Sequence, residues 1–422
     1  MDRLIPAVLV ILVSFTACTP KHPHIDSFET VWETIHEDHY DPIFGGVDWE
    51  ESRRRFQPLI AGATSISEFN DIVNEMLFEM NLSHQLVIDP KDLEKSLPVL
   101  FAPGSIGIQV RILNGRVVVS SVEKDSPADQ QGIKIGYTII KIGNTSTEKL
   151  IKNPSMIPPF NSRHKQNRAA NDVMALIYGA PNTDVKLTYL DYRANRIEKT
   201  FIRKGLEPTA SEFSALPPYY LNIKSKVIDG SIGYIWISQF DDSLESDLEN
   251  ILKSMADTKG IVIDLRGNSG GFFSAVDWLA EQLITEKTVF YQMKFRNRTV
   301  NNRISPTKNG YKGQVVVLID ALSTSASEAF AAGIQEIGRG AVIGDRSPGF
   351  ILGCKWKELS NGAVFMHTVA QILSPNGKLL EGHGVIPDVE IALDAIQLKK
   401  GEDSQLNEAV KYINAQVLHL EN

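Results

Sequence analysis

Two stretches of small and polar residues combine the residue types that acyl-transfer chemistry needs. The first, Arg-Gly-Asn-Ser-Gly-Gly at residues 266–271, follows the apolar run 260–265, and the second, Ser-Thr-Ser-Ala-Ser-Glu at residues 323–328, follows the apolar run 315–319. A serine at a helix N-terminus lies beside unpaired N–H groups and the positive end of the helix dipole, which favour an oxyanion. A glycine-rich turn at a neighbouring strand end offers another N–H without steric obstruction. The same residues are also typical of N-caps and turns, so the pattern alone leaves a structural role open.

The segments around these stretches predict an α/β architecture. From about residue 205 to 400, apolar strand patterns alternate with helical patterns, which is typical of a layered α/β domain. Residues 232–237 and 260–265 are nearly continuous apolar runs suited to buried strands. Each predicted strand ends in a small-residue loop that begins a helix, so the two stretches are expected at strand ends.

The region from about 25 to 95 has a different period. Apolar residues recur there at three- and four-residue spacing, which predicts helices with one core-facing side; they are Phe28, Val31, Trp32 and Ile35, and then Phe69, Ile72, Val73, Met76, Leu77 and Met80. The second helix runs into the polar segment Asn-Leu-Ser-His at residues 81–84.

The segment from about 100 to 204 is predicted to be rich in strands. Residues 107–110 and 117–119 form apolar runs around Asn114-Gly115, a strong hairpin signal. The order of "DSPA", "GIKIG" and "IIKIG" after them resembles a PDZ domain. In that family a loop before the first strand holds a peptide carboxylate while the peptide adds a strand to the sheet edge, which implies a site at Gly104, Ile106, Gly107 and Ile108. The Asn-, Pro- and Arg-rich stretch 150–172 is expected to be an inserted loop.

Composition excludes several classes of protein. The chain has 422 residues, of which 43% are hydrophobic and 22% charged, and this indicates a globular protein of more than one domain. With 43 basic and 51 acidic side chains the net charge is −8, so no nucleic-acid partner is expected. Two cysteines cannot form a disulfide framework or a cysteine-based zinc site.

The histidines His36 and His39 lie in an acidic, aromatic helix end that is expected to be solvated, and no metal or cofactor is expected.

The N-terminus is typical of a lipoprotein signal. An apolar run at residues 5–13 is too short to span a bilayer, and Thr16 and Ala17 precede Cys18 in a sequence that resembles a bacterial lipobox. This predicts lipidation of Cys18 and attachment to the cell envelope by lipid alone, on the periplasmic face of the outer membrane.

Taken together, these segments resemble tail-specific, C-terminal processing serine peptidases and their tricorn-core relatives. The resemblance lies in the helical N-terminal region, the PDZ-like insert, "YIWISQF", "DLRGNSGG", "STSASEAF", "GAVIGDRSPG" and "EGHGVIPDVEI". It implies that Ser325 is the nucleophile and that the N–H groups of Ala326 and of Gly270 or Gly271 form the oxyanion hole. It also implies a core of the ClpP/crotonase type.

The sequence departs from one branch of this family at the general base. Enzymes with a Ser/Lys dyad carry a lysine where this chain has Phe350, which cannot accept a proton. Lys355 and Lys357 follow, but a displaced dyad would need a shift of register. A catalytically silent relative that binds peptides or apolar ligands is therefore an open alternative.

The tricorn-like branch implies another base. There a histidine preceded by a serine, and a glutamate near the C-terminus, match Ser83, His84 and Glu381. A histidine titrating near ~6.5 can accept the serine proton, and a third polar group fixes its tautomer. His383, expected to share a strand face with Glu381, is the rival base.

The sequence thus predicts a serine endopeptidase of the tail-specific or tricorn-core type that acts on peptides or protein tails. We expect a signal peptide at 1–17, a helical region at 18–98, a PDZ-like domain at 99–204, a peptidase core at 205–400 and a C-terminal helix at 401–422. Neither the substrate nor the oligomeric state follows from the sequence.

Overall fold

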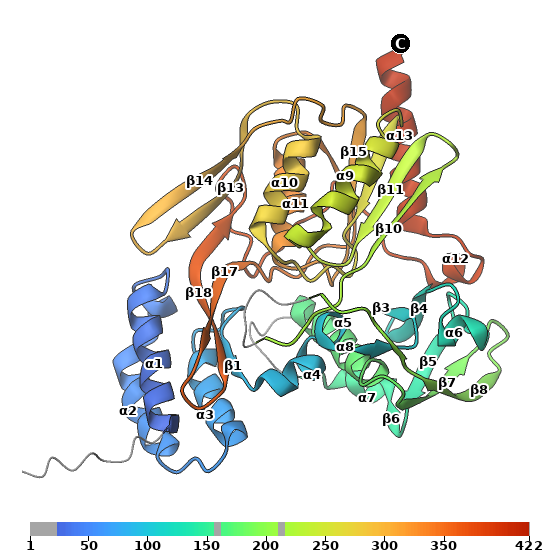
Figure 1. The fold of residues 1–422 in the computed structure, drawn as a ribbon. Helices are drawn as coiled ribbons and strands as arrows, with labels where there is room; N and C mark the ends of the chain where they lie inside the picture. Colours follow the sequence, from blue (N-terminus) through green and yellow to red (C-terminus); the bar gives the residue numbers. More distant parts are fainter. Residues whose placement is uncertain (1–22, 156–161, 210–215, 422) are drawn as a thin grey trace, which may run out of the picture.

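The N-terminal helices carry the apolar faces that their spacing predicted. The structure, a computed structural model, describes residues 23–155, 162–209 and 216–421 (Figure 1). Its first helices are α1 (Pro23–Asp38), α2 (Trp49–Ile60) and α3 (Ile66–Phe78). Phe28, Val31 and Phe69 are fully buried where these helices pack together. Ser65 caps α3 by accepting the N–H of Glu68.

This region also contributes a strand that its helical pattern did not predict. β1 (Leu86–Ile88) pairs antiparallel with β18 (Val364–Leu373), with Leu86 opposite Met366. Three residues are too few to give a period-2 signal. The sheet continues through β13 (Thr288–Phe295) and β14 (Arg298–Ile304), and β17 (Leu352–Glu358) also pairs with β18. The segment between α3 and β1, which contains Ser83 and His84, is therefore held at both ends.

A second sheet forms the PDZ-like part of the chain. Its strand order is β3-β4-β5-β7-β8, with β6 beside β5. The strands are β3 (Ile108–Leu113), β4 (Arg116–Val122), β5 (Thr138–Ile142), β6 (Thr145–Ser146), β7 (Asp184–Leu190) and β8 (Arg196–Ile202). The hairpin predicted at Asn114-Gly115 joins β3 to β4. The short elements η2 (Pro90–Asp92), α4 (Leu93–Ser96) and α5 (Pro98–Phe101) precede this sheet in the chain. The two-residue strands β2 (Gly104–Ser105), before the sheet, and β9 (Lys204–Gly205), after it, pair with each other.

The stretch 150–172, expected to be an inserted loop, is largely helical where the structure describes it. The helices of this domain are α6 (Pro127–Gln130), α7 (Thr147–Lys152) and α8 (Ser162–Ile177). The polar composition near the start of α8 concealed its helical character, because its buried apolar residues Val173, Met174 and Ile177 lie toward its other end. α8 packs beside the edge strand β3.

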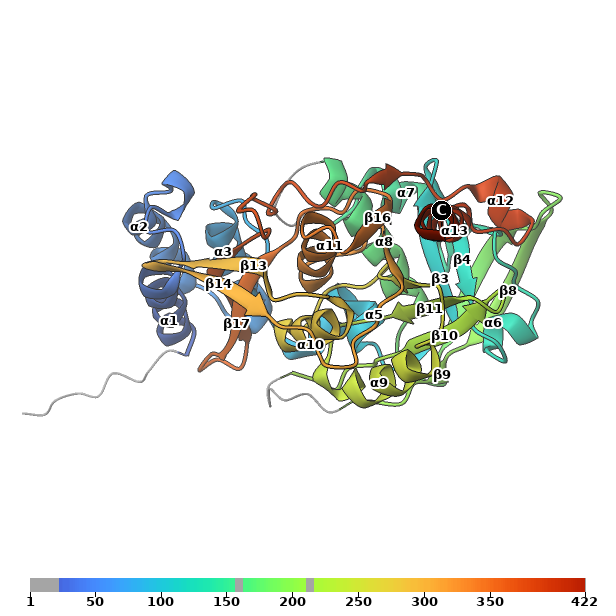
Figure 2. The same cartoon turned by 90° about the horizontal axis from the view of Figure 1, so that it is seen from above.

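The third sheet is the layered α/β core. Its order is β10-β11-β12-β15-β16-β19, parallel from β11 onward. The strands are β10 (Ile223–Ile228), β11 (Ile232–Ile237), β12 (Gly260–Asp264), β15 (Gln314–Ile319), β16 (Gly340–Gly344) and β19 (Val389–Glu390). The helices α9 (Glu245–Ser254), α10 (Phe273–Leu283) and α11 (Ala326–Glu336) cover one face, and α13 (Ser404–Glu421) covers the other (Figures 1 and 2). The predicted fold class is confirmed.

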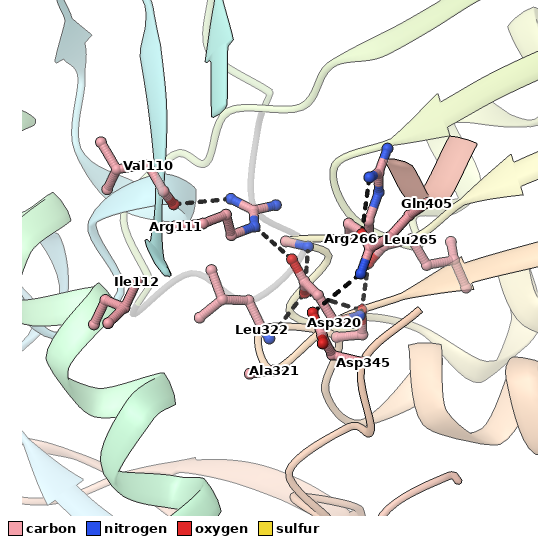
Figure 3. A network of polar contacts seen from close by, with 12 residues as sticks. Val110, Arg111, Ile112, Leu265, Arg266, Asp320, Ala321, Leu322, Asp345 and Gln405 are labelled. Carbon is pink, nitrogen blue, oxygen red and sulfur yellow. Dashed lines mark hydrogen bonds and ion pairs between the residues drawn. The ribbon is translucent and has the colours of Figure 1, made fainter. Parts of the chain in front are cut away.

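The PDZ-like sheet and the core are joined through polar contacts. Figure 3 shows Arg111 of β3 reaching across to Asp320, which follows β15. The carboxylate of Asp320 also accepts the N–H of Gly267 at 3.0 Å and that of Leu322 at 2.9 Å. A further contact is made by α12 (Ala395–Lys399), whose Leu398 packs against Val118 of β4. Arg111 thus joins the PDZ-like sheet to both small-residue loops of the core.

Candidate active site

Ser325 lies at a sharp junction between a buried strand and a helix. β15 ends at Ile319, and α11 begins at Ala326, so Ser325 is the N-cap residue. Its backbone has φ 56° and ψ −120°, a region that non-glycine residues rarely adopt. Such strain persists only where surrounding contacts enforce it, and it occurs preferentially at functional sites.

The glycine-rich loop lies directly against this serine. β12 and β15 are parallel neighbours, with Asp264 opposite Leu318, so both loops leave the same edge of the sheet. A Cβ at Gly270 would be 2.6 Å from the Cβ of Ser325, which makes glycine necessary at this contact. The N–H of Thr324 and the hydroxyl of Ser327 both bind the carbonyl of Asn268, at 3.0 and 3.1 Å.

Three polar residues from distant segments form a connected chain that ends at Ser325. The Nε2 of His84 is 3.2 Å from the Oγ of Ser325, and its Nδ1 is 2.7 Å from the Oγ of Ser83. Ser83 donates its hydroxyl to Glu381 at 3.0 Å and its N–H to the same carboxylate at 2.9 Å. Because Ser83 donates its hydroxyl proton to Glu381, the Oγ of Ser83 accepts the Nδ1–H of His84. The Nε2 of His84 therefore carries no proton and faces Ser325 as an acceptor. That tautomer is the one a general base requires.

Burial dominates the electrostatics of this chain. It lowers the pKa of His84 to about 4, and the positive charge of Arg168 acts in the same direction. Burial also raises the pKa of Glu381 to about 7, although hydrogen bonds from Ser83 and Ile351 oppose the rise. The imidazole is therefore neutral at neutral pH, as a proton acceptor must be.

Two backbone N–H groups near Ser325 have no internal acceptor. The N–H of Gly270 is donated to the side chain of Asn268 at 2.8 Å. In the part of the chain that the structure describes, no hydrogen bond uses the N–H of Gly271 or of Ala326, the first residue of α11. Of the predicted oxyanion-hole residues, Gly271 and Ala326 thus keep N–H groups for a ligand, and Gly270 serves through its lack of a side chain.

Glu328 is a buried acidic residue that the sequence analysis did not single out. Its carboxylate accepts four hydrogen bonds: from the hydroxyl of Ser347 at 2.6 Å and the N–H groups of Gly349 at 2.7 Å, Phe350 at 2.9 Å and Ser325 at 3.1 Å. Burial raises the pKa of Glu328 to about 8, and these donors oppose the rise. Glu328 thereby joins the backbone of the serine to the loop 347–350. The sequence pattern that could have indicated this role is a glutamate three residues after a serine at the start of a helix, which is typical of a capping box.

Replacing Glu328 by glutamine is expected to destabilise the protein and to slow its reaction. The glutamine NH₂ group would face N–H donors, and a buried donor without an acceptor costs about 1–3 kcal/mol. Thermal unfolding and the rate of active-site labelling measure the two effects. Glu281→Gln on α10 is the matched control. Equal stability and labelling of Glu328→Gln and Glu281→Gln would contradict this role.

The rival bases lie elsewhere. His383 is exposed in a turn, where its Nδ1 lies 2.9 Å from the carbonyl of Glu381; the expectation that it shares a strand face with Glu381 was wrong, because residues 381–383 form a turn and not a strand. Lys355 is exposed on β17, and the Nζ of Lys357 binds the hydroxyl of Thr34 on α1. No hydrogen bond among the described residues joins either lysine to Ser325.

Phe350 has a structural role where related enzymes carry the dyad lysine. Its carbonyl accepts the N–H of Ser325 at 2.7 Å, and its ring stacks on His164 of α8 with centroids 4.1 Å apart. With phenylalanine at this position, the Nε2 of His84 and the Oγ of Ser325 are 3.2 Å apart.

A hollow lies between the C-terminal end of β3 and α8, and none of the residues predicted to bind a tail, 104–108, lines it. Its volume is about 310 Å³, and the residues that line it include Ile112, Ile151 and Ala169. Two carbonyls of β3 have side-chain partners: Val110 accepts from Arg111 at 3.0 Å, and Ile112 accepts from Gln166 at 3.2 Å.

The predicted carboxylate loop precedes this strand. Gly104 pairs with Gly205, and the N–H of Gly107 binds the hydroxyl of Ser105 at 2.9 Å. Ile106 and Ile108 are buried at 0% and 2% exposure, so their side chains are not available to a ligand.

The prediction for one histidine at the acidic helix end was wrong. His39 was expected to be solvated, but it is fully buried, with its ring 4.7 Å from that of Tyr40. Its Nδ1 contacts the backbone of Asp41, and its tilted contacts with the rings of Tyr40 and Phe44 cover it from water. No group of three or more His, Cys, Asp or Glu residues suited to a metal occurs in residues 23–155, 162–209 and 216–421.

Three family models match successive parts of the chain. Residues 231–391 match peptidase family S41, residues 25–78 match the tricorn protease C1 domain, and residues 104–158 match the PDZ domain. These matches, together with relatives named as carboxy-terminal processing proteases, support the predicted resemblance to serine-type peptidases of family S41.

Curated relatives and solved structures agree with this placement. The carboxy-terminal processing protease CtpB of Bacillus subtilis is 25% identical over 99% of this chain and 79% of its own length. The putative tricorn protease homolog 2 of Streptomyces coelicolor is 24% identical over 88% of this chain, which spans only 30% of that protein. The photosystem II D1 C-terminal processing protease has a TM-score of 0.56 at 19% identity, covering 89% of this chain and 95% of that one. The structural likeness shows the fold, and the two relatives agree with the family-model matches.

Proposed function

We propose that this protein is a serine endopeptidase that cuts peptides or protein tails with Ser325 as nucleophile and His84 as general base. The observation that carries the proposal is the 3.2 Å contact between the Nε2 of His84 and the Oγ of Ser325, with the other ring nitrogen bound to Ser83. An alcohol is a weak nucleophile at neutral pH, and a positioned neutral imidazole activates it.

The reaction follows from these positions. The Oγ of Ser325 attacks the scissile carbonyl while its proton passes to His84, and the N–H groups of Gly271 and Ala326 stabilise the resulting oxyanion. His84 then returns the proton to the leaving amine, and the acyl-enzyme is hydrolysed by water activated in the same way. Ser83 and Glu381 hold the imidazole and stabilise its charged form.

The test of this function is cleavage of a defined tail. A stably folded reporter that ends in an unstructured tail with a free carboxylate is incubated with the full chain or with Ser325→Ala, and the products are identified by mass spectrometry. The wild type should shorten the tail and Ser325→Ala should not. Persistence of every tail with folded wild-type protein would refute the proposal.

We further propose that the PDZ-like domain binds the free end of the tail, with the peptide added as a strand beside β3. In the Ser325→Ala protein, calorimetry should give at least about tenfold weaker binding for an amidated tail, because a charge-assisted hydrogen bond contributes about 1.5–3 kcal/mol. Equal affinity for both tails would remove the carboxylate site from Gly104, Ile106, Gly107 and Ile108.

The localisation rests on the sequence alone, since Cys18 lies outside the described residues. We propose that lipid on Cys18 anchors the protein in the cell envelope, on the periplasmic face of the outer membrane. No helix in the described ranges is long and apolar enough to cross a bilayer. Cys18→Ala should be released from membranes on fractionation, and unchanged membrane association of this variant would argue against the anchor.

A further inference from the structure

Asn268 of the glycine-rich loop is a fully buried polar residue that bonds to three separate segments. Its Oδ1 accepts the N–H of Gly270, two residues further along the loop, at 2.8 Å. Its Nδ2 donates to the carbonyl of Ile237, the last residue of β11, at 3.0 Å. Its own carbonyl accepts the N–H of Thr324 at 3.0 Å and the hydroxyl of Ser327 at 3.1 Å. Both ends of the side-chain amide are therefore used, and the backbone of the same residue joins the glycine-rich loop to the second small-residue loop.

The first peptide plane of the glycine-rich loop is held at both of its polar ends. Its N–H, on Gly270, is bound by the side chain of Asn268, and its carbonyl, on Ser269, accepts the hydroxyl of Thr324 at 2.9 Å. Gly270 has φ 103°, in the left-handed region, so the chain bends sharply at this residue. A peptide plane between two fixed partners resists rotation, and its orientation sets the direction of the plane that follows it.

The second peptide plane carries the N–H of Gly271. Its carbonyl, on Gly270, accepts the N–H of Phe240 at 2.7 Å. Because the N–H and C=O of a trans peptide point in opposite directions, the N–H of Gly271 points away from Phe240. No hydrogen bond within the described parts of the chain uses this N–H. A rotation of the first plane would carry this donor away from the position that it is proposed to share with the N–H of Ala326.

We propose that Asn268 is a positioning residue for the oxyanion hole. Its side chain orients the N–H of Gly271, and its carbonyl ties the glycine-rich loop to the loop that leads to Ala326, the second donor. The inference rests on the proposed peptidase function, and it assigns to a residue without solvent exposure a role in transition-state stabilisation. Such stabilisation depends on donors that are already in place, because donors that must reorient during the reaction lose much of their effect. An amide suits the position because it accepts and donates at once.

Asn268→Ala tests this role, with Asn361→Ala as the matched control. Asn361, in the turn between β17 and β18, likewise accepts an N–H from two residues further on, that of Ala363, and its Nδ2 lies 3.1 Å from the Nδ1 of His24. Asn268→Ala should lower kcat at least about 10²-fold, the loss expected when one oxyanion donor is removed, while Asn361→Ala keeps the wild-type value. In the Ser325→Ala protein, adding Asn268→Ala should leave the affinity for a tail peptide unchanged. A loss confined to KM, or equal kcat values for Asn268→Ala and Asn361→Ala, would overturn the proposal.

A peptide boronic acid separates a misplaced donor from weaker substrate binding. Its adduct with the Oγ of Ser325 places a negative oxygen where the oxyanion forms, so its affinity follows transition-state stabilisation. Asn268→Ala should weaken inhibition by the same factor by which it lowers kcat/KM. Unchanged inhibition by the boronic acid would overturn the proposal.

A second variant acts on the other end of the same peptide plane. Thr324→Val keeps the shape of the side chain but removes the hydroxyl that binds the carbonyl of Ser269. It should also lower kcat, and the double variant should be hardly slower than Asn268→Ala alone, because both changes release one plane. Fully additive losses would overturn the proposal. If Asn268→Ala does not fold, Thr324→Val decides alone, and a wild-type kcat would overturn the proposal.

Amide hydrogen exchange keeps this inference separate from the peptidase proposal. The pair Ser-Gly occurs once in the sequence, at residues 269–270, so ¹³C-carbonyl serine combined with ¹⁵N-glycine selects the N–H of Gly270 in the full chain. Exchange of this N–H should be at least about tenfold faster in Asn268→Ala than in the wild type, because its acceptor is lost. Equal exchange in both proteins would overturn the role of Asn268 whether or not the wild type cleaves any peptide. Faster exchange in the variant, with a wild type that neither cleaves peptides nor binds the boronic acid, would refute the peptidase function alone.

Discussion

Ser325→Ala and His84→Ala are each expected to lower the rate of peptide cleavage on the order of 10⁶-fold, because each removes one member of a unit that acts together. The physical reason is the 3.2 Å contact between the two side chains, through which the serine proton leaves. The double variant should be hardly slower than either single variant. Steady-state rates on one tail peptide measure all three.

A fluorophosphonate probe separates this mechanism from a lysine dyad. The probe should label the wild type at Ser325, His84→Ala should lose nearly all labelling, and Lys355→Ala and Lys357→Ala should retain it. Labelling that survives in His84→Ala but disappears in Lys355→Ala would restore the lysine as base. A folded wild type that is never labelled would instead indicate a silent peptide-binding protein.

Glu381→Gln should reduce kcat by about 10³-fold while leaving the affinity for a tail nearly unchanged. The carboxylate of Glu381 accepts N–H groups of Ser83 and Ile351, whereas the NH₂ group of a glutamine would face them as another donor. The resulting shift of Ser83 would release the imidazole from its tautomer, and loss of the correct tautomer greatly lowers kcat in enzymes with a serine and a histidine base. The ratio of kcat to KM effects distinguishes this loss from weaker binding. A change confined to KM would assign Glu381 to substrate binding.

The pH profile of the wild type provides a second readout for Glu381. Since its pKa is raised to about 7, protonation below that value removes the negative charge that supports Ser83 and the imidazolium, so the rate should rise as pH increases through about 7. His84, with a pKa near 4, is already neutral in that range. The other charge that acts on the imidazole is that of Arg168. In Glu381→Gln the transition near 7 should disappear.

The residues proposed as nucleophile, base and supporting carboxylate could be singled out from the sequence because each lies in a short segment with a recognisable residue pattern. Their distances could not, since the hydrogen bond from His84 to Ser325 joins residues 241 positions apart. The sequence shows that Phe350 cannot take a proton. Its packing between His164 and Arg168 was not predicted, because both residues lie on α8, whose polar residues led to the prediction of a loop. Glu328 was missed because a glutamate in the first turn of a helix is usually no more than a cap.

The long reach of these contacts has a consequence for how the protein is made. Ser83 and Glu381 are 298 residues apart, and both must be present before the imidazole is held in its working orientation. In a chain that is still being synthesised, Ser325 and the glycine loop precede Glu381, so the proposed nucleophile is made before the carboxylate that supports its proposed base. On the proposed mechanism, we expect cleavage activity to begin only after Glu381 has been synthesised and has bound Ser83.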